Sequence, residues 1–190
     1  MISVAVTAIK NTQRYLNFGK MFNPMELKPA MTVLESHPTF SAWKSKNKDA
    51  YLSHAFKMFQ DQHTEWQLGF YQRKKEKITT FTVTPTAVEM RDAEEVFKKE
   101  ENEIKPVELT DTTLGLTDVI AKANAFQQKN YPKDASMKII ALLQSLPEYG
   151  SVWNITYVTQ AFNTLNMKIH PESGKILDHK LSSIFSFRQK

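Results

Sequence analysis

Two short stretches of this sequence, about 87 residues apart, carry the same alternation of large apolar residues. Trp66-Gln67-Leu68-Gly69-Phe70 and Trp153-Asn154-Ile155-Thr156-Tyr157 each place a large apolar side chain at every second position. Period-two alternation is typical of a β-strand with one buried face. A tryptophan at the start of each strand can bury a large area, so we expect both indoles in the protein core.

The elements around these strands also occur twice, beginning with a helix. Apolar residues at i, i+3, i+4 and i+7 predict one apolar helical face in each half: Leu27, Ala30, Met31 and Leu34, then Leu116, Val119, Ile120 and Ala123. Asn23, Pro24 and Glu26 form a helix-start signal before the first helix, with Asn23 as the cap. Pro38 should interrupt that helix, because proline lacks a backbone N–H.

Strand-like segments follow each helix. We expect strands over 51–59, 66–71 and 78–83, and again over 137–143, 153–158, 165–169 and from Lys175 onward. The predicted fold class is therefore α+β, with two tandem helix-on-antiparallel-sheet units. Their expected limits are an N-terminal extension 1–22, a first unit 23–91, a charged linker 92–112 and a second unit 113–190. The linker should begin as a solvated helix, because residues 92–108 are densely charged.

The second half resembles the PepSY domain family, which has cystatin-like helix-on-sheet units. The resemblance rests on the Trp153-led strand and on the turn His170-Pro171-Glu172-Ser173-Gly174 before Lys175-Ile176-Leu177. It covers residues 114–181 well and residues 23–91 more loosely. His170 stands where the family usually has Asp, and the first half has Thr84-Pro85-Thr86-Ala87 without a glycine. The resemblance implies a non-catalytic module that restrains peptidases or associates with proteins, in a family with many members outside the cytoplasm.

Composition excludes several classes of protein. The 190 residues contain no Cys, which excludes disulfides, thiolate metal sites and cysteine nucleophiles. No stretch approaches the roughly 20 apolar residues that span a bilayer. The apolar residues 2–9 lack a preceding basic region and make a poor secretory signal. We therefore expect a cytoplasmic protein, or an extracytoplasmic one if a leader has been removed.

The sequence contains no local catalytic motif, such as a nucleophile elbow, a P-loop or a zinc-binding HExxH helix. We considered His170 and His179 with Asp178 as a cation site, and His63 with Glu65 as an acid–base pair. Paired surface histidines are commoner than metal sites, and nothing supplies a nucleophile beside His63. We expect no catalytic residue, no metal and no cofactor, so the chain should not be an enzyme.

The candidate partner-binding residues lie around a basic hairpin tip. Phosphate-neutralising charge stands there beside two rings: Phe70, Tyr71, Arg73, Lys74 and Lys75. A solvated tip that discourages edge-to-edge sheet pairing is the simpler interpretation, so nucleic acid is not the main partner we expect. We predict a non-catalytic binding or regulatory protein that engages a protein or peptide through an open sheet face or inter-domain groove. The alternatives are a peptidase inhibitor-like module and a single-stranded nucleic-acid binder, and edge strands would allow a homodimer.

Overall fold

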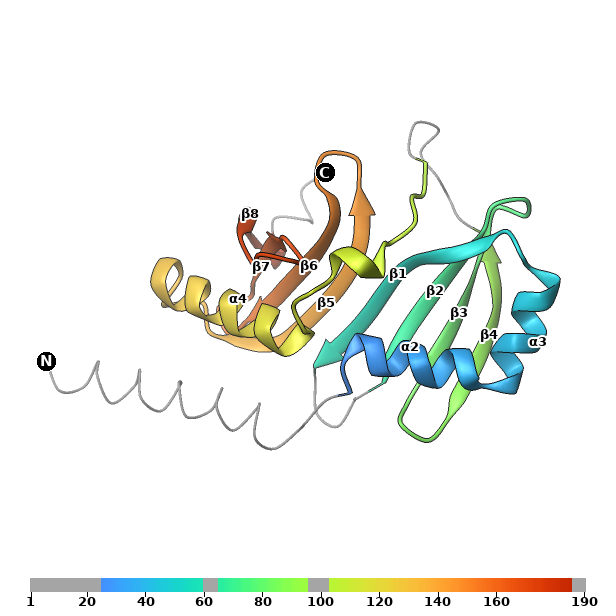
Figure 1. The fold of residues 1–190 in the computed structure, drawn as a ribbon. Helices are drawn as coiled ribbons and strands as arrows, with labels where there is room; N and C mark the ends of the chain where they lie inside the picture. The colour runs from blue at the N-terminus through green and yellow to red at the C-terminus, as the bar shows by residue number, and fades with distance from the viewer. Residues whose placement is uncertain (1–24, 60–64, 96–102, 186–190) are drawn as a thin grey trace, which may run out of the picture.

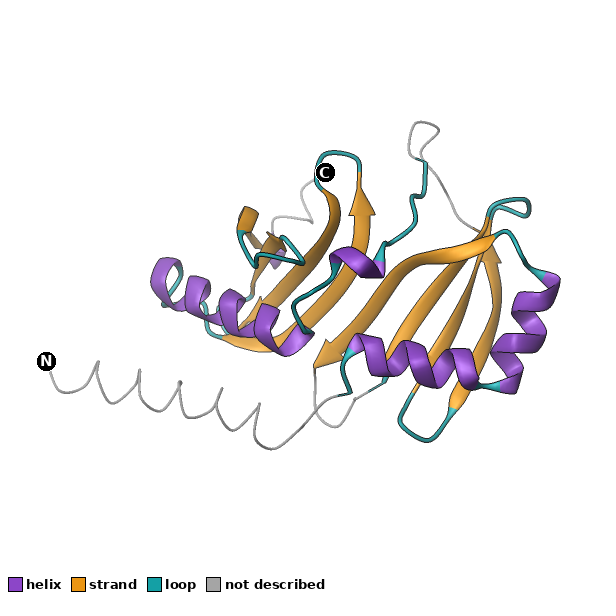
Figure 2. Cartoon of the chain, in the orientation of Figure 1, coloured by secondary structure: helices purple, strands orange, loops and turns teal. Residues whose placement is uncertain are grey.

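The computed structural model describes residues 25–59, 65–95 and 103–185, and these residues form a single antiparallel sheet with helices on one face (Figures 1 and 2). The sheet has eight strands in the order β4-β3-β2-β1-β5-β6-β7-β8. The first half supplies β1 (Ala50–Phe59), β2 (Trp66–Gln72), β3 (Lys77–Val83) and β4 (Val88–Glu95). The second half supplies β5 (Ser136–Leu146), β6 (Gly150–Thr159), β7 (Asn163–Ile169) and β8 (Ile176–Ser183).

The described helices are α2 (Leu27–Ser36), α3 (Pro38–Lys46) and α4 (Leu116–Asn130), with a short 3₁₀ helix at Leu109–Asp111. Two of the helices, α2 and α4, are those that the apolar spacing predicts. Pro38 separates α2 from α3 as expected, and the His37 ring nitrogen accepts a hydrogen bond from the Thr39 N–H at the start of α3. In Figure 1, α2 and α3 lie over the β1–β4 half of the sheet and α4 lies over the β5–β8 half.

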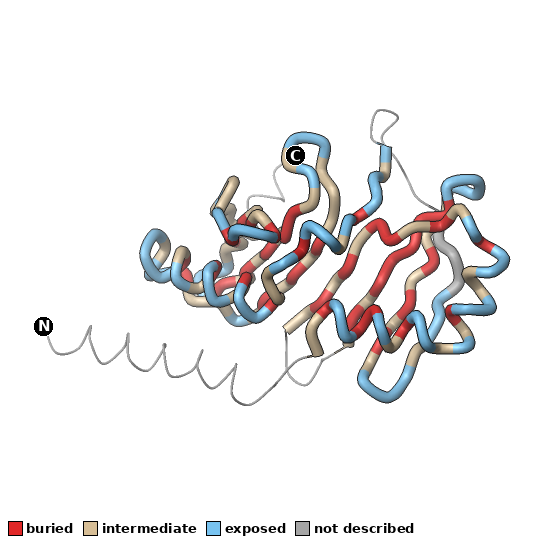
Figure 3. Tube along the Cα trace, in the orientation of Figure 1, coloured by how far each residue is buried: buried red, intermediate tan, exposed pale blue. Residues whose placement is uncertain are grey.

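The prediction of two tandem helix-on-sheet units is wrong, because β1 and β5 pair with each other. Six residue pairs join them, from His54–Gln144 to Phe59–Ile139, so the sheet continues across the middle of the molecule. The buried apolar side chains of both halves belong to one cluster between the sheet and the helices. Buried residues accordingly lie along the strands of both halves of the sheet (Figure 3). The limits at 23–91, 92–112 and 113–190 stay a prediction about the sequence, but they do not mark separate sheets.

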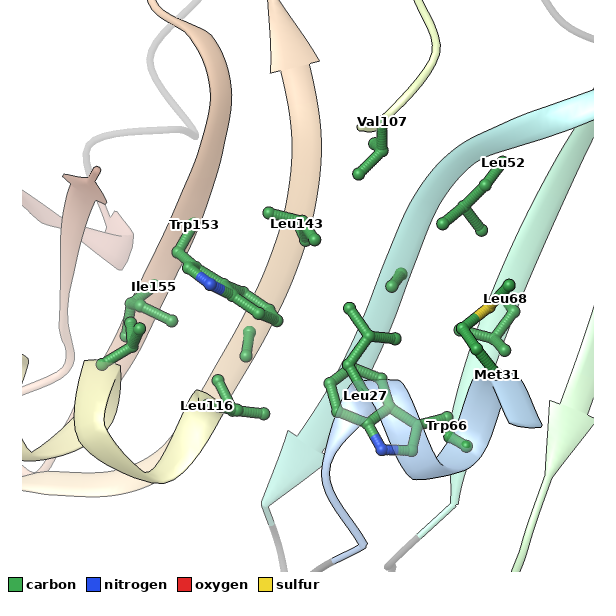
Figure 4. Packing of buried hydrophobic residues seen from close by; sticks show 14 of the residues in the cluster. Leu27, Met31, Leu52, Trp66, Leu68, Val107, Leu116, Leu143, Trp153 and Ile155 are labelled. Atoms are coloured by element: carbon green, nitrogen blue, oxygen red, sulfur yellow. The ribbon is translucent and has the colours of Figure 1, made fainter. Parts of the chain in front are cut away.

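Both predicted core tryptophans are fully buried in this cluster. Trp66 of β2 lies close to Leu27 of α2, and Trp153 of β6 lies close to Leu143 of β5 (Figure 4). The aromatic residues of the first half add a second group: Phe40 of α3 packs against Phe70 and Phe81, with ring centroids 5.0 and 5.2 Å away. The core is therefore one continuous layer of side chains, which lies between the sheet and the helices and extends to both sides of the β1–β5 pair.

The predicted start of the first helix differs from the observed one. Asn23 and Pro24 lie outside the described residues, and α2 begins at Leu27. The Glu26 carboxylate does not cap its own helix. It accepts hydrogen bonds from the N–H groups of Leu116 and Thr117 at 2.7 and 3.1 Å, and so caps the first turn of α4. This contact joins the beginnings of two helices that are 90 residues apart in sequence.

The charged segment 92–108 is also different from the prediction. Its first residues, 92–95, complete the edge strand β4, and residues 96–102 lie outside the described part. From Glu103 the chain passes the beginning of β1 and returns to the helix side. Val107 donates its N–H to the Leu52 carbonyl at 2.9 Å and is buried in the core. The N-terminal extension 1–22 lies outside the described residues as well.

Candidate functional site

A groove of about 550 Å³ lies where β1 and β5 meet, and most of its lining residues come from strands, on the sheet face opposite the helices. Alternation along the strands places Trp66, Leu68 and Phe70 under the helices, and Gln67 therefore faces the other way. We call this hollow the central groove. Phe56 and Leu142, which are directly opposite each other on β1 and β5, both line it.

A β-bulge lies in β1 where this strand lines the groove. The β1–β2 register shifts between Leu52 and His54, so Ser53 is the extra residue. The β1–β5 ladder ends at the His54–Gln144 pair, whereas β5 remains paired with β6 through Ser145 and Leu146. Among the described residues, no strand pairs with the β1-facing edge of β5 beyond Gln144. The groove therefore lies beside a short open strand edge.

His54 lies against Gly69 inside the groove. A Cβ atom at position 69 would be only 2.1 Å from the His54 Cε1 atom, so the imidazole occupies the space that the glycine leaves open. His54 Nδ1 is 3.1 Å from Ser53 Oγ, and Ser53 Oγ donates to the Gly69 carbonyl at 3.0 Å. Burial lowers the pKa of His54 below its ordinary value, because the surroundings disfavour the charged ring. The imidazole is therefore neutral at pH 7.

The segment from Glu103 to Lys105 forms one wall of the groove. The Tyr51 hydroxyl donates to the Ile104 carbonyl at 2.5 Å, which holds this segment against the beginning of β1. Glu103 Oε1 forms an ion pair with Arg73 Nη2 at 2.6 Å on the surface. Both side chains of that pair are mostly exposed, so the pair contributes little stability, but it places opposite charges at the groove rim.

The rest of the helix-free face is polar over β6 and β7. Asn166 Nδ2 donates to Asn154 Oδ1 at 2.5 Å and to Thr156 Oγ1 at 2.7 Å. Lys168 forms an ion pair with Asp178 of β8. The apolar lining residues Phe56 and Leu142 thus lie next to a hydrogen-bonded polar surface.

The predicted partner-binding residues are not gathered into one surface. Phe70 and Tyr71 are both buried, at 4% and 2% exposure, and as neighbours in β2 they point to opposite faces of the sheet. Arg73 pairs with Glu103 as described above. The Lys74 N–H donates to Asp49 at 3.0 Å, and Lys75 Nζ donates to Asn47 Oδ1 at 2.8 Å. The two rings are not placed to stack on bases, and partner binding by the charged tip stays a prediction.

His170 and His179, which were considered for metal binding, contact different neighbours. His170 Nδ1 accepts from the N–H groups of Glu172 and Ser173 in its own turn. The His179 ring packs 4.9 Å from Phe126, and its Nδ1 is 2.7 Å from the Tyr131 hydroxyl. Within the described residues, no group of three or more potential metal ligands occurs. His63 lies outside the described part of the chain.

Comparison with known proteins gives a likeness of fold. No protein-family model matches the chain, and no curated protein matches it. The crystal structure of a proposed lipoprotein from Clostridium difficile 630 is similar, with a TM-score of 0.52 and 12% sequence identity. The match covers 76% of this chain and 90% of that one. At this identity the likeness concerns the fold alone.

The helices of the described residues are too short and too polar to cross a lipid bilayer. The described residues thus form an α+β protein with one eight-stranded antiparallel sheet, helices on one face and a groove on the other. One feature of the sequence, Gly69, could have indicated the groove. This glycine interrupts a predicted strand, and a glycine inside a strand often marks a close approach by another group.

Proposed function

We propose that this chain is a non-catalytic binding protein that holds a short extended peptide in the central groove. The observation that carries the proposal is the end of the β1–β5 ladder at His54 and Gln144, which leaves an open edge of β5 beside the groove. A peptide strand can satisfy its backbone groups on such an edge, while alternate side chains enter the hollow beside it.

The size and lining of the groove support this kind of ligand. Its volume of about 550 Å³ is in the usual range for ligand pockets and suits one or two side chains. Phe56 and Leu142 provide apolar contact, and Gln67, Thr80 and Gln144 provide neutral hydrogen-bonding groups. A few polar groups among apolar ones can orient a ligand without binding it through charge.

A binding role also agrees with the state of Ser53. This residue is adjacent to His54, but its side chain is buried and its hydroxyl donates to the Gly69 carbonyl. A serine in this arrangement is not presented to a substrate as a nucleophile. The contact with His54 is better explained as a support for the imidazole.

The other functions stay predictions with less support. Peptidase inhibition depends on the resemblance to PepSY domains. Nucleic-acid binding would have to use the charged tip without the rings of Phe70 and Tyr71. For location, a cysteine-free sequence is compatible with the cytoplasm, and the similar structure of a proposed lipoprotein supports the extracytoplasmic alternative.

The test is selection of a peptide followed by groove variants. A phage-displayed library of random octapeptides is selected on the full chain, and the affinity of the best synthetic peptide is measured by calorimetry. We expect Phe56→Ala to weaken binding about tenfold, because a half-buried aromatic contact is lost. Val158→Ala is the matched control, since Val158 is a half-buried apolar residue of β6 that does not line the groove. Equal losses in both variants, or no selected peptide, would refute the proposal.

A further inference from the structure

The Ser53 hydroxyl determines which nitrogen of His54 carries the proton. A serine hydroxyl has one hydrogen, and here it is directed to the Gly69 carbonyl. If that hydrogen pointed to His54 instead, the lone pairs of Ser53 Oγ and the Gly69 oxygen would face each other at 3.0 Å. The favourable arrangement is therefore a chain in which His54 Nδ1–H donates to Ser53 Oγ, and Ser53 O–H donates to Gly69.

This tautomer leaves Nε2 of the neutral ring as a hydrogen-bond acceptor. No described residue forms a hydrogen bond with Nε2, and His54 is one of the residues that line the central groove. A half-buried acceptor without a partner costs free energy unless water or a ligand donates to it. The position of the ring is fixed from below by Gly69 and from the side by Ser53.

The ionisable side chains that line the groove with His54 are Glu103 and Lys105, both in the wall segment. The groove residues from β2, β3 and β5, which include Gln67, Thr80 and Gln144, are all uncharged. The opposite charges of the wall partly cancel, and Glu103 is engaged by Arg73. Burial is therefore the main influence on the protonation of His54, and it favours the neutral ring.

We infer that His54 Nε2 is the specificity-determining acceptor of the groove, and that the bound peptide presents a neutral N–H or O–H donor beside an apolar side chain. This inference rests on the proposed peptide-binding function. A backbone amide, or the side chain of Asn, Gln, Ser, Thr or Trp, supplies such a donor. Protonation of His54 converts Nε2 into a donor, which then faces the donor of the peptide. Binding should therefore be lost in acid.

The state of the free protein can be tested without a ligand. Long-range ¹H–¹⁵N NMR spectra of the ¹⁵N-labelled full chain distinguish the two neutral tautomers of each histidine. We expect the His54 signals to show a protonated Nδ1 and a bare Nε2 at pH 7.5. The opposite tautomer would overturn the inference and would leave the peptide-binding proposal intact.

The role in binding is tested with the library-selected octapeptide as the probe, between pH 4.5 and pH 7.5. In wild type we expect at least about a tenfold loss of affinity toward acid pH. His54→Gln keeps a carbonyl acceptor that does not titrate, so its affinity should be nearly independent of pH. His54→Phe keeps a ring over Gly69 without an acceptor, and it should bind about tenfold more weakly even at pH 7.5.

Two comparisons complete the test. Glu103→Gln should retain the pH dependence of wild type, and loss of that dependence would assign it to Glu103 and overturn the inference. Equal affinity of wild type and His54→Phe at pH 7.5 would also overturn the role of His54, whereas sensitivity to Phe56→Ala would still support the groove. Thermal unfolding of each variant establishes that it is folded before binding is measured.

Discussion

The rings of Trp66 and Trp153 lie 6.3 Å apart, centroid to centroid, although one belongs to each half of the chain. Both side chains are fully buried in the cluster that includes Leu27 of α2 and Leu116 of α4. An aromatic pair at this separation is in direct contact. The two indoles therefore belong to one core, which the pairing of β1 with β5 closes across the centre of the sheet.

We expect the two halves to unfold together. Two variants would each retain one of these indoles as the fluorescent reporter: Trp43→Phe with Trp153→Phe, and Trp43→Phe with Trp66→Phe. Within each variant, the fluorescence midpoint in urea should equal the midpoint from far-ultraviolet circular dichroism, because a shared core unfolds cooperatively. A fluorescence change that precedes the loss of half of the circular dichroism signal would show that the halves unfold separately.

The Glu26 cap of α4 should contribute measurable stability. Glu26→Gln removes the charge at the N-terminus of α4 and one of two good acceptors, so we expect a loss of about 1–2 kcal/mol in the free energy of unfolding. Glu35→Gln is the control, because Glu35 is exposed on α2, and it should change stability by less than about 0.5 kcal/mol. Hydrogen exchange of the Leu116 and Thr117 amides should be faster in Glu26→Gln only. Unchanged exchange would contradict the cap.

Lys57 should give the protein an unusual dependence on alkaline pH. Its side chain is 1% exposed, its Nζ donates to the Met25 carbonyl at 3.3 Å, and burial lowers its pKa from 10.5 to about 8. Since the folded pKa is below the unfolded one, the unfolded chain binds more protons between these values. Stability from this group should therefore rise from about pH 8 to about pH 10.5.

Lys57→Met tests this dependence. Trp66 Nε1 also donates to the Met25 carbonyl, at 2.7 Å, so the carbonyl keeps a partner in the variant. At pH 7 we expect a melting temperature about 2–4 °C above that of wild type, and a difference that shrinks between pH 8 and pH 10. Lys180→Met, at an exposed position, should show no such convergence. A difference that grows with pH would contradict the assignment.

Gly69 and His54 should be energetically coupled. Gly69→Ala would place a methyl group in the space that the His54 imidazole occupies. We therefore expect a loss of about 1–3 kcal/mol in the free energy of unfolding. In the His54→Ala background the space is open, and the same change should be close to neutral. Urea unfolding of the four proteins gives the coupling free energy. An equal cost of Gly69→Ala in both backgrounds would refute the close contact.

Local patterns predict most of the helices and strands. The apolar spacing of α2 and α4, the break at Pro38 and the burial of both tryptophans are confirmed, because each depends on neighbours in the sequence. The edge strand β4 is not predicted, because the charged residues 92–95 at its end look in sequence like the start of a solvated helix. The pairing of β1 with β5 depends on residues 80 to 90 positions apart, from Phe59–Ile139 to His54–Gln144, which no local period encodes.

The candidate site is predicted less well for the same reason. Proximity in sequence groups Phe70 and Tyr71 with a basic tip, but neighbouring strand residues point to opposite faces. His54 gains its role from a bulge at Ser53 and from a glycine on the next strand, and these meet only in the folded sheet.

The central position of β1 has a consequence during synthesis. The chain has 76 residues between the end of β1 at Phe59 and the start of its partner β5 at Ser136. A ribosome that adds about 5–20 residues per second needs roughly 4–15 s to make that stretch. Throughout this interval the nascent first half presents the unsatisfied backbone of a long, apolar inner strand, so chaperone demand should be greatest before translation reaches β5.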